Sequence, residues 1–340
     1  MKIWMDILTP KQLLFSEAII EKISKNHDIL CTSRLYNEVS KLSKIRNFNL
    51  VFVGKYGGDK KSTKLDAHLD RMKKLSPLIT KFSPDLTISF CSPEAARISF
   101  GLAIKHVAFC DSPHADAVMR LTLPLIQKLL IPWIIPKKEF VKYGIEPKNI
   151  IPYKAIDAVI TIKRQSTKKQ NLNFKKSNKK RILIRMEEEQ AAYSSKSIKI
   201  VPIIKKIIDE FNEENIIILG RYSEQIKKLK TLFGKKAHIL EMSYDGKFLL
   251  ENIDVFIGSG GTMTAESALL GVPTISYNAV PNIVENYLVK NNLVKRESNP
   301  QKIVKIIKKY IESSDNEIKK RAKRISNQME DPIQKLLKII

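Results

Sequence analysis

The feature of this sequence that most constrains its fold is a stretch that reads as strand, glycine turn, helix and second strand, residues 253–277. Its short apolar run, residues 253–257, is typical of a buried parallel strand. Glycine lets the backbone turn sharply after such a strand and approach a ligand without a Cβ clash. The turn consists of Gly258, Ser259, Gly260 and Gly261. This order predicts a parallel sheet in which the helix starts at the turn.

The helix after the turn is expected to create an anion site. Thr262 is a candidate cap for it, and Gly271 followed by Pro273 predicts its end. The unpaired N–H groups and the positive dipole end of such a helix favour a phosphate. Glycine also occurs in these turns for packing alone, and no strict phosphate motif is matched. We interpret the turn as a phosphate site because a hydroxyl lies on each side and Glu266 lies one helical turn in.

The order Gly-Ser-Gly-Gly-Thr, then Glu266, then Ala-Leu-Leu-Gly-Val-Pro-Thr resembles the donor-binding turn of GT-B glycosyltransferases. It is also similar to the matching turn of the non-hydrolysing UDP-N-acetylglucosamine 2-epimerases. Nearly the whole chain resembles domain-of-unknown-function family 354 of this superfamily, through the stretches WMDILTPKQ, SFCSPEAARISFGL and FCDSPHADAVMRLTLPL. The resemblance implies an α/β, GT-B-like fold of two Rossmann-like, doubly wound domains with a ligand cleft between them.

The resemblance also implies how a nucleotide-sugar donor is held. Glu266 would bind both ribose hydroxyls, since an ionised carboxylate accepts two hydrogen bonds. The alternative is an acid that only complements the helix dipole. The turn of residues 258–261, together with Thr262, would cradle the diphosphate. Met242 and Ser243 match the place where related enzymes read the base.

Arg185 and Glu187 come just after the first strand expected in the second half of the chain. Strand ends of open parallel sheets are where ligands bind, so Arg185 could pair with a phosphate through two hydrogen bonds. An ion pair between Arg185 and a neighbouring glutamate is an equal alternative.

Asp111 and His114 form a second constellation, at the end of a strand expected in the first half. A carboxylate and an imidazole three residues apart can act as general acid and base. For His114 the alternative is a helix-cap residue. The resemblance to the epimerases places an acid near Asp111 and an arginine near Arg120. The epimerase signature around them is otherwise not reproduced, which counts against 2-epimerisation.

Two further turns are expected to open onto the same cleft. Asp6, Thr9 and Lys11 flank the first strand–helix turn, and Ser92 and Glu94 flank the fourth. Of these, Thr9, Ser92 and Glu94 are candidates for substrate binding. Thr9 and Ser92 are also good helix caps, so structure alone could explain them.

Alternating strand and helix patterns predict two parallel-sheet domains. The expected divisions are a first domain of residues 1–162 on the acceptor and catalytic side, a basic linker 163–181, and a nucleotide-sugar-binding domain 182–315. Helices in residues 316–340 are expected to cross back to the first domain by resemblance. Within the first domain, a helix is predicted over 115–130, followed by a short strand at 133–136.

The net charge of +25 predicts attraction to polyanions or to an anionic membrane surface. Lysine is spread through the whole chain, so a solvated surface explains most of it. We expect no nucleic-acid partner, because no recognition helix or zinc-finger spacing occurs. No metal and no cofactor are expected beyond the nucleotide-sugar substrate. The absence of a secretory signal and of a long apolar stretch predicts a cytoplasmic protein, at most peripheral at the inner membrane face.

We therefore interpret the chain as an enzyme, a GT-B glycosyltransferase. It would use a nucleotide-activated sugar, a UDP-sugar in the first instance, in surface glycan or glycolipid synthesis, with a sugar or lipid-linked acceptor. One alternative is an enzyme like the UDP-N-acetylglucosamine 2-epimerases. Another is a non-catalytic protein that binds nucleotide-sugars or polyanions.

Overall fold

The computed structural model describes the chain except for residues 59, 166–177, 188–199, 241–243, 278–281 and 314–315. The described residues form two compact units. Unit 1 comprises Met1–Arg164 and Met329–Ile340, and unit 2 comprises Gln165–Gln328. Most of the segment 163–181, interpreted above as a linker, therefore lies outside the described residues.

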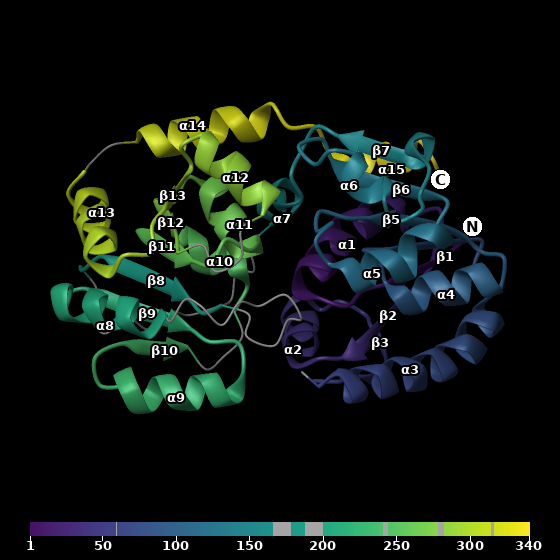
Figure 1. Ribbon diagram of the computed structural model, residues 1–340, viewed down its shortest axis with the longest axis horizontal. Coiled ribbons are helices and arrows are strands. Elements are labelled where there is room, and N and C mark those ends of the chain that lie inside the picture. Colours follow the sequence, from purple (N-terminus) through teal and green to yellow (C-terminus); the bar gives the residue numbers. More distant parts are fainter. Residues whose placement is uncertain (59, 166–177, 188–199, 241–243, 278–281, 314–315) are drawn as a thin grey trace. The chain divides into compact units, whose positions relative to one another are not determined.

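Unit 1 contains a seven-stranded sheet in the order β3-β2-β1-β4-β5-β6-β7, with every neighbouring pair parallel (Figure 1). Its strands are β1 (Lys2–Asp6), β2 (Asp28–Leu35), β3 (Val51–Lys55), β4 (Leu86–Ser89), β5 (Lys105–Phe109), β6 (Lys128–Pro132) and β7 (Ile150–Tyr153). Its helices are α1 (Pro10–Ile23), α2 (Asn37–Arg46), α3 (Lys61–Phe82), α4 (Pro93–Gly101), α5 (Asp116–Thr122), α6 (Lys138–Val141), α7 (Ala158–Lys163) and α15 (Pro332–Leu337). The strand order reverses between β1 and β4, which is the place where doubly wound sheets bind ligands.

The two helices that start at this reversal begin as the sequence predicts. Thr9 caps α1 by accepting a hydrogen bond from the Gln12 amide, and Ser92 caps α4 by accepting one from the Ala95 amide. Proline follows each cap, where its missing N–H costs no helical hydrogen bond. Both helices therefore begin directly at the carboxyl ends of β1 and β4.

The helix predicted over 115–130 is wrong in its second half. Helix α5 ends at Thr122, a short 3-10 turn (Leu123–Leu125) follows, and β6 begins at Lys128. Pro124 lacks the N–H that would continue the hydrogen bonds of α5. The apolar run that looked helical is the buried part of β6, a strand covered on both faces. The strand expected at 133–136 is therefore β6, which lies earlier in the chain, at Lys128–Pro132.

Unit 2 contains a six-stranded parallel sheet in the order β10-β9-β8-β11-β12-β13. Its strands are β8 (Arg181–Arg185), β9 (Asn215–Leu219), β10 (His238–Leu240), β11 (Val255–Gly258), β12 (Thr274–Ser276) and β13 (Val294–Arg296). Its helices are α8 (Ile200–Glu210), α9 (Ser223–Phe233), α10 (Gly246–Glu251), α11 (Thr262–Leu270), α12 (Ile283–Lys290), α13 (Pro300–Glu312) and α14 (Glu317–Asn327). Here the order reverses between β8 and β11, so the glycine turn after β11 lies at the switch point.

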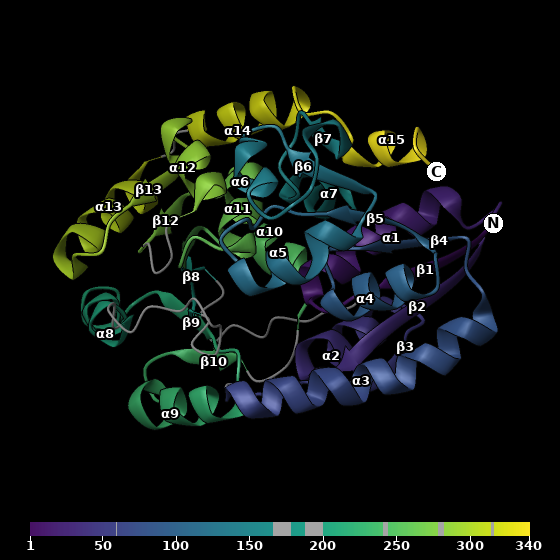
Figure 2. The ribbon, with the colours of Figure 1, turned by 45° about the vertical axis from the view of Figure 1, so that its right-hand side comes forward.

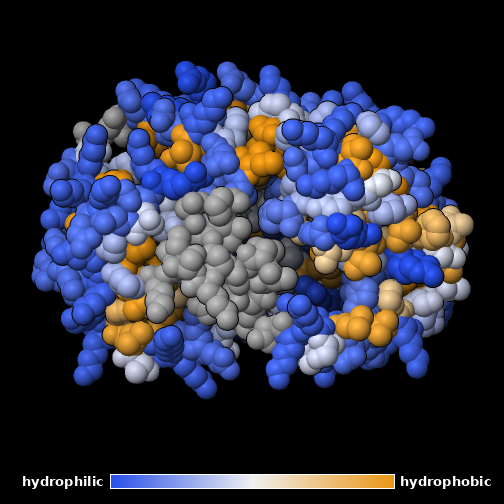
Figure 3. Space-filling view, in the orientation of Figure 1, coloured by the Kyte–Doolittle hydropathy of each residue, from blue (hydrophilic) through white to orange (hydrophobic). Residues whose placement is uncertain are grey.

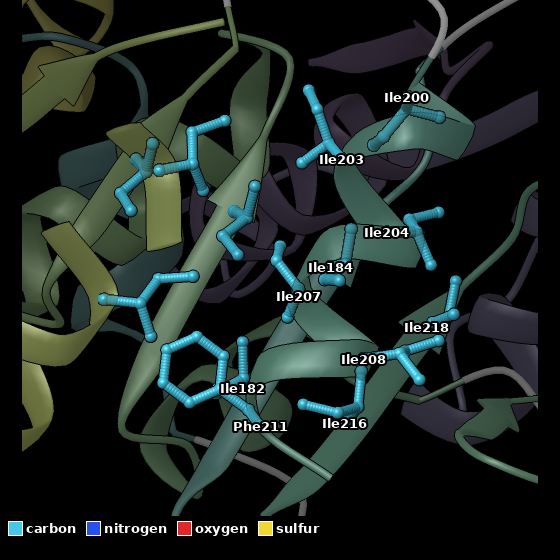
Figure 4. Close-up of a cluster of buried hydrophobic side chains, with 14 of the residues drawn as sticks. Ile182, Ile184, Ile200, Ile203, Ile204, Ile207, Ile208, Phe211, Ile216 and Ile218 are labelled. Carbon is cyan, nitrogen blue, oxygen red and sulfur yellow. The ribbon is translucent and has the colours of Figure 1, made fainter. Parts of the chain in front are cut away.

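The central strands of unit 2 bury side chains on both faces of the sheet. Ile182 and Ile184 of β8 join a cluster of isoleucines from β9 and α8 (Figure 4). Leu183, which lies between them, belongs to a separate cluster with Phe256 of β11. Because successive side chains of a strand point to opposite faces, helices must cover both sides of this sheet.

The helices at the end of the chain divide between the two units. Helix α14 packs on α11 in unit 2, and the Cα of Lys319 lies 2.7 Å from where a Cβ on Gly271 would be. Residues from Met329 onward belong to unit 1, where α15 packs beside β7 (Figure 2). The part of the segment 316–340 that joins the first domain therefore starts at residue 329.

The face drawn in Figure 3 is largely hydrophilic, and its hydrophobic residues lie in small separate groups. This agrees with a chain that carries 60 lysines and arginines against 35 acids. Among the described residues, no helix combines the length and the apolar character that a membrane span requires.

Candidate functional site

The glycine turn of unit 2 connects β11 to α11 in a conformation that packing dictates at two positions. Gly260 has φ +91°, and a Cβ there would lie 2.9 Å from a carboxylate oxygen of Glu285. A Cβ on Gly258 would lie 2.6 Å from both the Phe256 ring and the Thr264 hydroxyl. Distances this short exclude a side chain, so glycine is required at both positions by the protein itself.

Gly261 is different, because none of the described residues explains its identity. Its φ of −83° is open to any residue, and a Cβ there would meet no atom of the described residues within 4 Å. The space beside Gly261 is therefore open to a group from outside, and a methyl group would obstruct it.

The same turn presents unpaired backbone amides. Helix α11 begins at Thr262, and Gly261 is its N-cap residue without a side-chain cap. The expectation that Thr262 caps this helix is therefore wrong. Instead, the Thr264 hydroxyl accepts a hydrogen bond from the Gly260 amide at 3.2 Å. The amides of Gly261, Thr262 and Met263 donate to no group among the described residues. Such amides at a helix N-terminus form an anion site.

Glu266 lies on the buried side of α11, with 6% of its surface exposed. One of its carboxylate oxygens is 3.6 Å from where a Cβ on Gly246 would be, at the start of α10. The carboxylate therefore lies between two helices of unit 2, one turn from the unpaired amides. Ser267, the next residue, instead hydrogen-bonds Thr274 of β12, which fixes α11 to the sheet.

Glu285 packs against the glycine turn, a role that no sequence pattern indicated. Its side chain is fully buried, and its carboxylate contacts Arg296 of β13, with the closest ion-pair atoms 3.3 Å apart. Asn282, the N-cap of α12, donates to the carbonyl of Gly260 at 2.9 Å. The backbone of the turn is therefore held by α12 as well as by α11.

Arg185 lies at the end of β8, as expected, and donates to the carbonyl of Gly220 at 3.0 Å. Glu187 accepts a hydrogen bond from the Tyr277 hydroxyl at 2.7 Å. Burial and this carboxylate raise the pKa of Tyr277, and a hydrogen bond with Ser259 opposes the shift. Ser259 thus connects the glycine turn to groups at the ends of β8 and β12. Met242 and Ser243 lie outside the described residues.

In unit 1, the switch point is filled by a buried ion pair. Arg71 of α3 donates to both carboxylate oxygens of Asp6, at 3.1 and 2.5 Å. The hydroxyls of Thr32 and Ser92 also donate to Asp6, at 2.7 and 2.6 Å. With four hydrogen bonds, Asp6 has no accepting capacity left for a ligand. Ser92 is therefore both the cap of α4 and part of this internal network.

Glu94 extends the same network towards His68. Its carboxylate lies 3.5 Å from Arg71 and 3.3 Å from His68, and the side chain is buried. Burial raises the pKa of Glu94, but the hydrogen bond from His68 and the charge of Arg71 outweigh it and lower the pKa to about 2. Glu94 thus stays ionised as part of an internal charge cluster.

Asp111 belongs to a second charge cluster at the same edge of the sheet. Lys11 of α1 lies 2.5 Å from Asp111 and 2.6 Å from Asp157. The Ser112 hydroxyl donates to Asp111 at 2.9 Å, and Tyr153 donates to Asp157. Burial opposes the charge of Lys11, but the two carboxylates outweigh it and raise the pKa of Lys11.

The pKa values of the two carboxylates of this cluster shift in opposite directions. Burial opposes ionisation at Asp111, but Lys11 outweighs it and lowers the pKa. Asp157 is more deeply buried, and its pKa is raised. Asp111 is thus an ionised carboxylate with part of its side chain exposed. His114 is exposed nearby, and partial burial lowers its pKa while the charge of Asp111 opposes the shift. A neutral imidazole beside a fixed carboxylate can accept a proton.

Arg120 lies on the surface of α5, away from these buried clusters. It pairs with Asp116 one helical turn earlier, at 2.9 Å, and both side chains are exposed. Its guanidinium also lies 5.7 Å from the centre of the Tyr143 ring.

The residues that complete these clusters carried little signal in the sequence. Arg71 and His68 lie on an amphipathic helix rich in lysine, where a buried arginine looks like a surface residue. Asp157 offered one sign, since it is an acid among apolar neighbours in the sequence Ala-Ile-Asp-Ala-Val. Charged residues in such a run are rarely buried without a partner. Among the described residues, no group of three or more His, Cys, Asp or Glu could hold a metal ion.

Comparison with known sequences gives a match over the whole chain. A family model described as "Protein of unknown function (DUF354)" matches residues 1–340. An uncharacterised protein of Methanocaldococcus jannaschii is 26% identical over 313 residues, which cover 90% of each chain.

Comparison with solved structures shows the fold. A UDP-GlcNAc 2-epimerase from Neisseria meningitidis bound to UDP-GlcNAc is similar with a TM-score of 0.73 and 16% identity, over 99% of this chain and 100% of that one. A spinosyn rhamnosyltransferase complexed with spinosyn aglycone is similar with a TM-score of 0.63 and 13% identity, over all of both chains. At these identities the likeness is one of fold. The expected GT-B-like class, with two Rossmann-like domains, is confirmed.

Proposed function

We propose that this chain, which belongs to the DUF354 family over its whole length, is a GT-B glycosyltransferase. It would transfer a sugar from a nucleotide-sugar, a UDP-sugar in the first instance, to a hydroxyl of an acceptor in surface glycan or glycolipid synthesis. Both the epimerases and the glycosyltransferases among the similar structures are named for reactions of sugars.

The observation that carries the proposal is the open space beside Gly261. Backbone strain and internal packing account for Gly260 and Gly258, but for Gly261 they account for nothing. The three amides at the start of α11 donate to no group in the part of the chain that the structure describes. A diphosphate fits there, because its oxygens accept those N–H groups and its approach requires a residue without a Cβ.

Glu266 would bind the ribose of the same nucleotide. Its carboxylate lies one turn further along α11, so one ligand can span the amides and the acid. A carboxylate beside a phosphate site repels a second phosphate but accepts hydrogen bonds from a vicinal diol. Arg185 would contribute a positive charge at the end of β8.

Residues of unit 1 would act on the acceptor. In a transfer step, the acceptor oxygen forms a bond to the anomeric carbon, the bond from that carbon to the diphosphate breaks, and the hydroxyl proton leaves. His114 would take the proton, and Asp111, held by Lys11 and Ser112, would stabilise the imidazolium that results. The amides beside Gly261 would stabilise the charge that develops on the leaving diphosphate.

Calorimetric titration of the whole chain with UDP and with UDP-sugars tests the donor site. Glu266→Ala should weaken binding by about 1.5–3 kcal/mol, the scale of hydrogen bonds to a charged group. Glu312→Ala, which removes an exposed acid from α13, is the matched control and should bind like the wild type. Unchanged affinity in a folded Glu266→Ala protein would remove this residue from the site.

Product analysis tests the reaction. With a suitable acceptor, transferred sugar supports the proposal, whereas an epimerised donor or an unchanged donor supports the alternatives. His114→Ala and Asp111→Ala should each lower turnover by roughly 10²–10⁴-fold and leave UDP affinity nearly intact. Wild-type turnover in either variant would defeat that assignment.

We also propose that the acceptor is reached at an anionic membrane face, on the cytoplasmic side. The net charge of +25 supports this, since each lysine or arginine near such a surface contributes about 1 kcal/mol. The apolar strand β6 is buried, so the lysine-rich surface would have to make the membrane contact. Sedimentation with anionic vesicles, lost on adding salt and absent with neutral vesicles, is expected. No sedimentation at low salt would favour a soluble acceptor.

A further inference from the structure

One arginine at the carboxyl edge of the unit 1 sheet makes no polar contact with the described residues. The guanidinium of Arg34, at the end of β2, makes no hydrogen bond or ion pair with any of them. Its Nε is buried, whereas its two Nη groups keep accessible surface. The Nη groups are therefore the donors that Arg34 can offer to a group from outside.

The Arg34 guanidinium lies over the ring of Tyr56, which in turn contacts Tyr36. Its central carbon lies 4.8 Å from the centre of the Tyr56 ring, and the Tyr36 ring lies 5.2 Å from that of Tyr56. A guanidinium stacked on an aromatic ring is restricted in orientation and still presents its N–H edge. Arg34 is therefore organised for recognition and is not a freely moving surface side chain.

The backbone beside Arg34 is irregular. The pairing of β2 with β3 shifts between Ser33 and Leu35, which is the position of Arg34. Bulges of this kind redirect a side chain and occur next to functional sites. On β3 the irregularity includes Gly54 at φ +72°, where a Cβ would lie 2.9 Å from the Cβ of Arg71.

The neighbouring charges leave Arg34 free to bind an anion. Asp6 and Glu94 lie within electrostatic range, but both are already engaged by Arg71, and Glu94 also by His68. The carboxylates of Asp6 and Glu94 balance the two guanidinium groups of this cluster, so it has no net charge when His68 is neutral. An incoming oxyanion is therefore attracted by Arg34 itself and does not have to displace a carboxylate from it.

We propose that Arg34 anchors an oxyanion-binding subsite in unit 1, which recognises a carboxylate or phosphate group of the acceptor. Both Nη groups would donate to two oxygens of that group, the geometry for which a guanidinium is suited. The assignment of the anion to the acceptor rests on the proposed function. The binding of an oxyanion at Arg34 is independent of that function.

Nitrogen-15 NMR of arginine side chains in the full chain tests the subsite with two probes, inorganic phosphate and malonate, at constant ionic strength. The Nε–Hε signal of Arg34, identified by its loss in Arg34→Lys, should shift saturably with at least one probe. The signal of Arg97, an exposed arginine on α4, is the internal reference and should not shift. A shift with phosphate alone assigns a phosphorylated acceptor, and a shift with malonate alone assigns a carboxylated one.

Variants complete the test. Arg34→Lys keeps the charge but loses the paired donors, and should weaken binding of the effective probe roughly tenfold, whereas Arg97→Met should leave it unchanged. No saturable shift at Arg34 in folded protein, or equal affinity in Arg34→Lys, would overturn the subsite. If the chain binds no UDP but Arg34 still responds, the donor proposal fails and the subsite stands.

Discussion

The two sheets of this chain share one topology but treat their switch points in opposite ways. In unit 1, the edge between β1 and β4 is filled by charged side chains that satisfy one another, with Asp6 and Arg71 at the centre. In unit 2, the edge between β8 and β11 carries a backbone turn whose first amides have no partner among the described residues, and the space beside Gly261 is open there. Under the proposed function, unit 2 would bind its ligand through backbone amides, whereas unit 1 would use side chains that rest on a buried ionic network.

The difference between the two switch points distinguishes residues that stabilise the fold from residues proposed to contact a ligand. Ser92 and Glu94 looked like substrate-binding residues in the sequence, and the structure places both in the internal network of unit 1. We therefore assign them to the support of the site. Variants of the network should change stability, and variants of the open turn should change binding.

The largest expected effect on stability is that of Arg71→Met. It leaves the carboxylates of Asp6 and Glu94 buried without their cation, which costs about 3–5 kcal/mol. Urea unfolding followed by circular dichroism measures this loss. Arg120→Met breaks an exposed pair and should hardly move the unfolding midpoint. A midpoint that is equally unchanged in Arg71→Met would mean that the network does not support unit 1.

Glu94 predicts a loss of stability in acid. Its pKa is about 2 in the folded protein and near its ordinary value of 4.5 when unfolded. Stability from this group is therefore complete above about pH 4.5 and is lost as the pH falls towards 2. The loss is up to about 3 kcal/mol. Urea unfolding at pH 5 and at pH 2.5 should differ less in Glu94→Gln than in the wild type. An equal difference in both proteins would contradict the assignment.

Gly260→Ala should destabilise unit 2 by about 1–3 kcal/mol, because alanine is strained at φ +91° and its methyl group would meet Glu285. Gly261→Ala is the matched substitution one residue away, and it should change stability by less than about 0.5 kcal/mol. Thermal unfolding of both variants decides this. If Gly261→Ala is as unstable as Gly260→Ala, internal packing explains both glycines, and the identity of Gly261 no longer indicates a ligand.

Much of the fold could be predicted because its signals are local. Cap and proline pairs at Thr9 and Ser92, and the turn at residues 258–261, mark where helices start after strands. The helix predicted over 115–130 was wrong where β6 begins. A strand that is buried on both faces lacks the alternation of polar and apolar residues that would distinguish it from a buried helix.

The candidate site was less predictable because its side chains come from different segments, which only the order of the strands in the sheet brings together. Asp111, Lys11 and Asp157 come from three segments far apart in the sequence, and their pairing follows from strand order. The unpaired state of Arg34 also depends on what its neighbours bind first. No single stretch of sequence contains that information.

Calorimetric titration of Gly261→Ala with UDP shows whether the turn at Gly261 holds a diphosphate. We expect the wild type to bind one UDP per chain. In Gly261→Ala, the affinity should fall at least tenfold while the melting temperature stays within about 2 °C of the wild type, because the added methyl group obstructs only the ligand. Equal UDP affinity in the two proteins, or no UDP binding by the wild type, would contradict it.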